Sequence, residues 1–457
     1  VELKVQSARL LRRDGSTVAA QQVSLDQQAE TLTLDFAAPL PAGQATVDLQ
    51  FTGILNDRLQ GFYRSRYNAP DGGERLLAPT QFESTHARRA FPCWDEPAIK
   101  ATFQVDLAVP EEYAAVSNTL VESREPIGGG QARVLFRPTP VISTYLLVFI
   151  IGDLESIEAV GDNGTLVRIW TTSGQSERGR FALDVSLRLL AYYNDYFGIP
   201  YPLEKLDHLA IPDFAAGAME NWGAITYRET ALLFDPESSS PGTRQRIAEV
   251  VAHEMAHMWF GDLVTMEWWD DLWLNESFAS WMATKAVDHL FPEWDMWTQF
   301  VVHDLNAGLG LDGLENSHPI EQAVRNPAEI NQLFDAISYS KGASIIRMLE
   351  QFLGPDAFQR GLQMYLGRHK HGNARTRDLW DALSQASGQP VAEIMDTWTT
   401  QTGYPVVEVS VNRGAQGTEV RLSQQRFMYE DLLGGGGGAG QSWKVPIGVR
   451  TARDPEP

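Results

Sequence analysis

The sequence predicts an α+β protein of several domains: an N-terminal antiparallel β domain, a mainly helical middle domain and a small C-terminal β module. The spacing of apolar residues is the main observation behind this fold class. Apolar and polar residues alternate up to about Gly174, a helical repeat begins near Gln175, and alternation returns after Gly403. A chain of 457 residues is also too long for a single hydrophobic core. We therefore expect domains at residues 1–174, 175–402 and 403–457.

The N-terminal domain shows the period-two pattern of half-buried strands. Residues 32–36, 47–51 and 103–109 alternate in this way, and turn-forming residues separate such segments. The apolar run 145–151 is far too short to span a bilayer, so it predicts a buried strand. We expect an antiparallel domain of sandwich character. Residues 79–97 interrupt the pattern because they are polar and rich in charge, and they predict a surface loop.

The middle domain has the repeat of amphipathic helices, and the last module returns to strands. Helices are expected at residues 180–197, 244–260, 334–352, 355–369 and 374–385. Between the first two of these helices, residues 217–221 are small and polar, and they predict a turn in a sheet. In the last module we expect strands at 406–411, 420–422 and 443–449, with a glycine-rich loop at 434–440.

Composition excludes several classes of function. The net charge of −22 argues against a nucleic-acid partner, whose phosphates would be repelled. Cys93 is the only cysteine, so no internal disulfide can form. No apolar run is long enough to cross a membrane and no signal peptide is visible, so we expect a cytoplasmic protein without a membrane partner. The chain begins at Val1 rather than Met, so the alternative is a protein whose N-terminal export signal has been removed. We also expect a monomer.

The most informative stretch is residues 250–279, which contains the pattern H-E-x-x-H. His253 and His257 are four residues apart, so on a helix both imidazoles can point at one ion. Glu276 follows in a second helix-like run, and two histidines with one glutamate are a standard ligand set for catalytic zinc. Glu254 can reach the open fourth position, where water would lie. We therefore predict one Zn²⁺ ion, held by His253, His257 and Glu276.

The residues that could carry function also have purely structural interpretations. The two histidines could be buried, hydrogen-bonded and inert, but placing them with a glutamate in an apolar helix costs desolvation unless something satisfies them. In residues 217–221, small side chains would let a ligand approach the backbone, and Glu220 would bring an anion to that edge. On the residues alone, however, this segment is more often an ordinary turn. Tyr339, likewise, would be ranked as a core tyrosine.

Several motifs together resemble the aminopeptidase N family of zinc exopeptidases, which are gluzincins. They are GAMEN at 217–221, HEMAH at 253–257, LNESFA around Glu276, ISYSKGA at 337–343, and the segments 80–97 and 143–155. They occur in that family's order over the first 405 residues. The resemblance implies a thermolysin-like catalytic domain at 175–402. It also implies hydrolysis of the N-terminal bond of peptides that have a free N-terminus, with broad preference for neutral and basic first residues.

The resemblance also implies a role for each site residue. The zinc ligands would be His253, His257 and Glu276, the general base Glu254, and the donor to the oxyanion Tyr339. Glu220 would anchor the substrate's α-ammonium with Glu83 as its partner, and Gln81 would shape the first side-chain subsite. The implied substrate-binding set is Gln81, Glu83, Gly217, Ala218, Met219, Glu220 and Asn221.

The chain departs from the family at its C-terminal end, and two other functions compete. Larger members end in a helical domain that roofs the site, whereas only about fifty residues follow Gly403 here. We expect a short form with a more open cleft. A zinc endopeptidase would share the chemistry but would not need Glu220 and Glu83. An inactive peptide-binding protein would lack the base or the phenol, and both Glu254 and Tyr339 are present.

Overall fold

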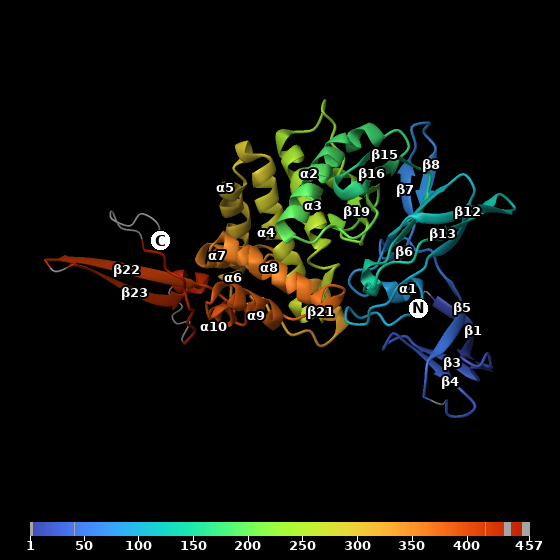
Figure 1. Cartoon of the computed structure of the whole chain (residues 1–457), viewed down its shortest axis with the longest axis horizontal. Coiled ribbons are helices and arrows are strands. Elements are labelled where there is room, and N and C mark those ends of the chain that lie inside the picture. Colours follow the sequence, from blue (N-terminus) through green and yellow to red (C-terminus); the bar gives the residue numbers. More distant parts are fainter. Residues whose placement is uncertain (1–2, 41, 416, 434–439, 450–457) are drawn as a thin grey trace. The chain divides into compact units, whose positions relative to one another are not determined.

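The computed structural model describes residues 3–40, 42–415, 417–433 and 440–449 (Figure 1). The chain divides into two compact units, each built from separate segments. The first unit comprises residues 1–157, 168–177 and 205–229, and the second comprises 158–167, 178–204 and 230–457. The predicted α+β class with strands first, helices next and strands last is confirmed. The three predicted domain boundaries stay a prediction.

Most of the first unit consists of short antiparallel sheets. Its strands are β1 (Leu3–Arg12), β2 (Thr17–Ala19), β3 (Gln22–Asp26), β4 (Thr31–Asp35), β5 (Ala45–Gly53), β6 (Gly61–Phe62), β7 (Ser65–Asn68), β8 (Glu74–Leu77), β9 (Thr80–Gln81), β10 (Asp106–Pro110), β11 (Ala114–Ser117), β12 (Val121–Gly128), β13 (Gln131–Phe136) and β14 (Phe149–Gly152). Two of the sheets have three strands, in the orders β2-β1-β5 and β10-β13-β12. The alternation at residues 32–36 and 47–51 corresponds to β4 and β5, whereas the alternation at 103–109 forms a strand, β10, only from Asp106 onward.

A five-stranded sheet follows, with the order β15-β16-β17-β19-β18. Its strands are β15 (Leu154–Val160), β16 (Leu166–Thr172), β17 (Lys205–Ile211), β18 (Ala218–Met219) and β19 (Ala224–Arg228). Strand β17 pairs in parallel with β19 and is buried along its whole length. Strand β18 pairs antiparallel with β19 and ends the strand order, so it is an edge strand.

Helices dominate the second unit. They are α2 (Arg180–Phe197), α3 (Pro241–His257), α4 (Trp273–Leu290), α5 (Met296–Phe300), α6 (Asn306–Asp312), α7 (Gly342–Leu353), α8 (Pro355–His369), α9 (Thr376–Ser387) and α10 (Val391–Thr399). Short strands β20 (Val264–Met266) and β21 (Gly372–Ala374) pair in parallel. Two short π-helices, Val301–Leu305 and Ile337–Lys341, lie among the helices, and each is called a π-turn below. No helix in the described part of the chain is long and apolar enough to cross a membrane.

The last strands, β22 (Pro405–Gly414) and β23 (Gly417–Arg426), include the predicted strands 406–411 and 420–422 and pair as an antiparallel hairpin (Figure 1, red). Its base is attached to α6 of the same unit: the Gly403 N–H donates to Asp312 Oδ1 at 2.7 Å, and the Tyr429 N–H donates to the Gly313 carbonyl at 3.1 Å. The loop expected at 434–440 lies, apart from Gly440, outside the described residues.

Three sequence predictions in the β regions are wrong, two of them because side chains replace strand partners. Residues 443–449 form no strand, since the Gln424 side chain bonds both backbone groups of Trp443. The predicted strand 145–151 begins only at Phe149, because the Asn118 side chain bonds the Leu146 carbonyl and the Val148 N–H. The expected surface loop at 79–97 instead contains β9 and a short helix, α1 (Ala87–Ala90), around the buried Phe82.

Helix boundaries in the second unit were predicted with mixed success. The bounds of α2 and α8 match the predicted 180–197 and 355–369. Helix α3 begins three residues earlier than expected, because Ser240 caps it by accepting from the Thr243 N–H at 3.1 Å and proline follows at the first helical position. The single helix predicted at 334–352 is a π-turn followed by α7.

Candidate active site

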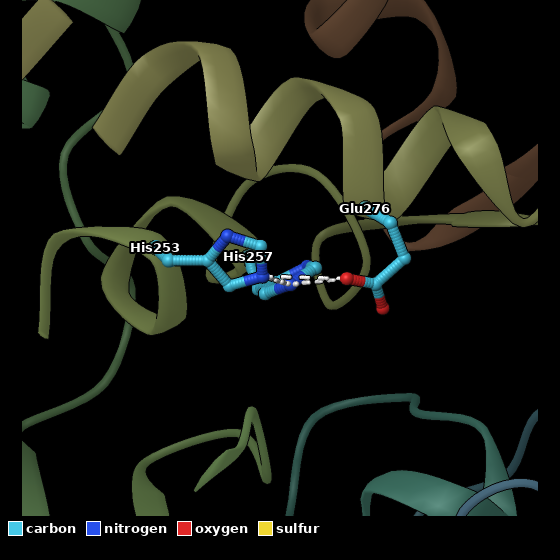
Figure 2. A group of neighbouring side chains, drawn as sticks. All are labelled: His253, His257 and Glu276. Carbon is cyan, nitrogen blue, oxygen red and sulfur yellow. Dashed lines mark hydrogen bonds and ion pairs between the residues drawn. The ribbon is translucent and has the colours of Figure 1, made fainter. Parts of the chain in front are cut away.

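Helices α3 and α4 bring three of the predicted site residues together. His253 and His257 project from the last turns of α3, and Glu276 from the first turn of α4. The Nε2 atoms of the two histidines are 3.1 Å apart. The Glu276 Oε2 atom lies 3.3 Å from the Nε2 atom of His253 and 3.6 Å from the Nε2 atom of His257. Figure 2 shows the two imidazoles and the carboxylate converging on one point.

These three atoms fit a tetrahedral zinc ion. Ligand nitrogens and oxygens lie about 2.1 Å from Zn²⁺, so tetrahedral neighbours are about 3.4 Å apart. The observed separations of 3.1, 3.3 and 3.6 Å bracket that value. The site is also largely dry, since the three side chains are 17%, 1% and 3% exposed in the order His253, His257 and Glu276. The set can therefore hold one ion and leave one coordination position open.

The electrostatics favour the protonation states that a metal needs. Burial lowers the pKa of His253 below its ordinary value, although its bond to Glu276 acts in the other direction. Burial acts to raise the pKa of Glu276, but the neighbouring His257 and His253 outweigh it, so that pKa lies well below its usual range. A neutral imidazole and an ionised carboxylate are the forms that bind metal.

A second layer of contacts orients the two imidazoles. The His257 Nδ1 atom is 2.9 Å from the Phe260 carbonyl, which only accepts, so Nδ1 donates and Nε2 is left to bind a metal. The His253 Nδ1 atom lies 3.4 Å from Ser280 Oγ. The chain leaves α3 after His257 and turns through Gly261, whose φ of +137° favours glycine. Sequence reasoning missed Phe260 and Ser280, because their role depends on how α3 ends and how α4 packs.

Glu254 and Tyr339 lie beside the ligand set. Glu254 is buried, and one of its carboxylate oxygens is within 4.8 Å of a ring nitrogen of His257. The Tyr339 ring stacks on His253, with centroids 5.9 Å apart and planes 21° from parallel. Tyr339 belongs to the π-turn Ile337–Lys341, a form of helix that is frequent at functional sites. The Ser277 hydroxyl donates to the Ser338 carbonyl and ties this turn to α4, next to Glu276.

The remaining predicted residues belong to the first unit. Gln81 ends β9 and is buried, and Glu83 follows two residues later. Glu220 is buried just beyond the edge strand β18, and one of its carboxylate oxygens lies within 4.8 Å of one from Glu83. The structure thus brings together two carboxylates that are 137 residues apart in the chain.

The segment 217–221 is an edge strand and the start of a turn, so the predicted turn is only partly correct. Ala218 and Met219 form β18, and the Gly217 carbonyl accepts from the Arg228 N–H at 2.9 Å. The Asn221 side chain donates to Thr226 Oγ1 at 3.0 Å, which braces the turn that follows. Glu220 is therefore held on a rigid sheet edge.

Two domain models of one protein family match this chain. Residues 181–398 match the peptidase family M1 domain, and residues 1–146 match the peptidase M1 N-terminal domain. The chain belongs to peptidase family M1. Membership confirms the resemblance that the sequence motifs indicated.

Relatives of this M1 chain are found in plants, animals and fungi. It is 49% identical over 430 residues to aminopeptidase M1 of Arabidopsis thaliana, a match covering 94% of this chain and 48% of that protein. It is 45% identical over 454 residues to the puromycin-sensitive aminopeptidase of Caenorhabditis elegans, covering 99% of this chain and 48% of that protein. The chain spans about half the length of the curated relatives it matches.

Gly342 shows how closely the M1 chain packs the Tyr339 turn against the ligand helix. A Cβ atom at Gly342 would lie 1.8 Å from Ser277 Oγ and 2.7 Å from Ser277 Cβ, so only glycine allows this approach. We expect Gly342→Ala to destabilise the protein by about 2 kcal/mol, the usual cost of overpacking, as measured by urea denaturation. Gly367→Ala in α8 is the matched control, because no atom lies within 4 Å of its added Cβ. Equal stabilities of the Gly342→Ala variant and wild type would contradict the clash.

Proposed function

We propose that the chain is a zinc-dependent aminopeptidase, which removes N-terminal residues from peptides. The observation that carries the proposal is the triangle of ligand atoms from His253, His257 and Glu276, with separations that suit one tetrahedral ion. Relatives named aminopeptidases support the reaction class.

The chain's own residues provide the acid–base chemistry of peptide hydrolysis. Zinc, when bound, supplies a Lewis acid that lowers the pKa of water and polarises a carbonyl. Glu254, adjacent to His257 and buried, takes the proton from the attacking water and passes it to the leaving amine. The Tyr339 hydroxyl, on the ring that stacks on His253, donates to the oxyanion that forms from the scissile carbonyl.

A free α-ammonium is the proposed cation for the Glu83–Glu220 pair. Two carboxylates within 4.8 Å repel each other when both are ionised, and a cation between them relieves that repulsion. This cation would fix the register of the substrate at its first residue. An endopeptidase has no need of such a pair, which favours exopeptidase action.

The edge strand β18 suits an extended peptide. A peptide can add to an exposed sheet edge through backbone hydrogen bonds, and Gly217, Ala218, Met219 and Asn221 form or support that edge. Gln81, whose Oε1 atom has no hydrogen-bond partner in the described part of the chain, is proposed to line the first side-chain subsite. We propose broad action on neutral and basic first residues, as the family resemblance implies, and the paired carboxylates favour tolerance of the basic ones.

Hydrolysis of four chromogenic amides tests the proposal. They are leucyl and arginyl amides, each with a free and with an acetylated N-terminus, assayed with and without a chelator. We expect turnover of the free forms alone, lost on chelation and restored by zinc. Equal turnover of the acetylated forms would indicate an endopeptidase and remove the roles given to Glu83 and Glu220. No turnover by the zinc-loaded chain would support a peptide-binding protein instead.

A further inference from the structure

The π-turn that carries Tyr339 is held by one carboxylate. Asp335 Oδ1 accepts from the Ile337 N–H at 2.8 Å and from the Ser338 N–H at 3.3 Å. The backbone carbonyl of Asp335 accepts from the N–H of Tyr339 itself at 3.1 Å. The N–H groups of Ile337 and Ser338 open the turn, where no preceding helical turn supplies acceptors. Asp335 therefore fixes the backbone from which the Tyr339 side chain projects.

The second oxygen of Asp335 is held by a histidine from elsewhere in the chain. His318 Nε2 lies 2.9 Å from Asp335 Oδ2, and His318 Nδ1 lies 2.8 Å from the Pro319 carbonyl. A carbonyl and an ionised carboxylate only accept, so both ring nitrogens must donate. The geometry thus assigns an imidazolium to His318, paired with the Asp335 carboxylate. A charge-assisted bond of this kind is stronger than a neutral one.

Several neighbouring groups act on the pKa of His318. Burial alone would lower the pKa of His318, but its bonds to Asp335 and to the Pro319 carbonyl, with the Asp335 charge, raise it above its ordinary value. The Lys341 cation acts in the lowering direction, and its own charge is paired with Asp312 at 2.9 Å. The His318–Asp335 pair is only partly exposed, with 21% and 26% of the two side chains accessible.

We propose that Asp335 and His318 are positioning residues for Tyr339: the pair sets the Tyr339 hydroxyl in the place where it meets the developing oxyanion. The effect of the pair on catalysis rests on the proposed aminopeptidase function. Its mechanical effect, that the pair holds the π-turn in place, does not depend on that function. The same turn is also tied to the ligand helix α4, because the Ser277 hydroxyl donates to the Ser338 carbonyl.

Amide hydrogen exchange tests the mechanical part without any assay of activity. In Asp335→Ala we expect the amides of Ile337 and Ser338 to exchange roughly tenfold faster or more, because they lose the side-chain oxygen that accepts their hydrogen bonds. Asp335→Asn keeps an acceptor oxygen and is expected to retain most of the protection. His318→Gln should give an intermediate increase. His289→Gln, an exposed histidine at the end of α4, is the matched control and should leave this segment unchanged.

A double-mutant cycle with Tyr339→Phe tests the catalytic part. In the wild-type background, Asp335→Ala is expected to lower kcat roughly tenfold to a hundredfold, with KM and zinc content little changed. In the Tyr339→Phe background the same substitution should lower kcat by less than about threefold, since the hydroxyl it positions is already gone. His318→Gln should show the same dependence on Tyr339.

The outcomes separate this inference from the proposed function. Unchanged exchange of the Ile337 and Ser338 amides in both Asp335→Ala and His318→Gln would overturn the inference, as would equal losses of kcat in the two backgrounds. If Asp335→Ala does not fold, Asp335→Asn and His318→Gln carry both comparisons. A wild-type chain that hydrolyses no peptide amide would contradict the proposed function, and the exchange comparison would then decide alone whether the pair holds the turn.

Discussion

Replacing Glu254 by glutamine is expected to lower kcat/KM for a leucyl amide by roughly a hundredfold to ten-thousandfold, the range in which a general base contributes. Glutamine has the same shape but cannot take a proton at neutral pH. Glu254 is buried on α3 beside His257, and it contributes no atom to the ligand triangle of His253, His257 and Glu276. The variant should therefore keep its zinc while losing its activity.

Zinc content and steady-state kinetics, measured on the same preparation, check this prediction. Glu249→Gln is the matched control, because Glu249 lies five residues earlier on α3 and undergoes the same chemical change. The control is expected to keep its activity within a few-fold. Retention of a tenth or more of the wild-type activity by Glu254→Gln would show that another group takes the proton. Loss of zinc would show that Glu254 supports the metal instead.

The parts of the site that lie close together in sequence could be predicted. The spacing of four residues between His253 and His257 depends only on helix geometry, and the structure places both Nε2 atoms 3.1 Å apart. Glu276 comes from a separate helix, but the second apolar run and the chemistry of the ligand set indicated it. Helices α2 and α8 were likewise predicted in full, because their ends carry glycine and proline signals.

The parts that depend on tertiary contacts could not be predicted from the residues. Tyr339 looks like a core tyrosine in the sequence, and only the family resemblance singled it out. Its π-turn depends on His318, 17 residues from Asp335, and on Ser277 of another helix. Glu83 and Glu220 meet although no local pattern links β9 to β18. Side-chain bonds from distant residues, such as Asn118 and Gln424, also decided which predicted residues form no strand.

Zinc binding is expected to stabilise the fold, and Glu276→Gln is expected to remove that effect. An ion that binds only the folded state adds about 4 kcal/mol to the free energy of unfolding when free zinc exceeds Kd a thousandfold. In Glu276→Gln a neutral amide replaces the carboxylate that completes the triangle. Loss of a residue that only hydrogen-bonds a metal ligand typically lowers metal affinity tenfold to a hundredfold. Loss of a ligand itself should therefore lower zinc affinity by more than about a hundredfold.

The pH dependence of the metal-free chain follows from the two lowered pKa values. The pKa of His253 is lower in the folded chain than its ordinary value of about 6.5, so the unfolded chain binds the extra proton first. Stability should therefore fall as the pH drops below about 6.5. Glu276 acts in the same direction: its contribution is present above its ordinary pKa of about 4.3 and is lost as the pH falls further. Protonation of these ligands also weakens zinc binding over the same range.

Thermal denaturation over a zinc titration, repeated from pH 8 down to pH 5, checks both effects. Wild type should melt at a higher temperature as free zinc increases, and the increase should shrink as the pH falls. Glu276→Gln should show little response to zinc at any pH. Glu293→Gln, which changes an exposed carboxylate just after α4, should respond as wild type does. A zinc response of full size in Glu276→Gln would mean that the ion is held elsewhere, because the triangle of His253, His257 and Glu276 would then be incomplete.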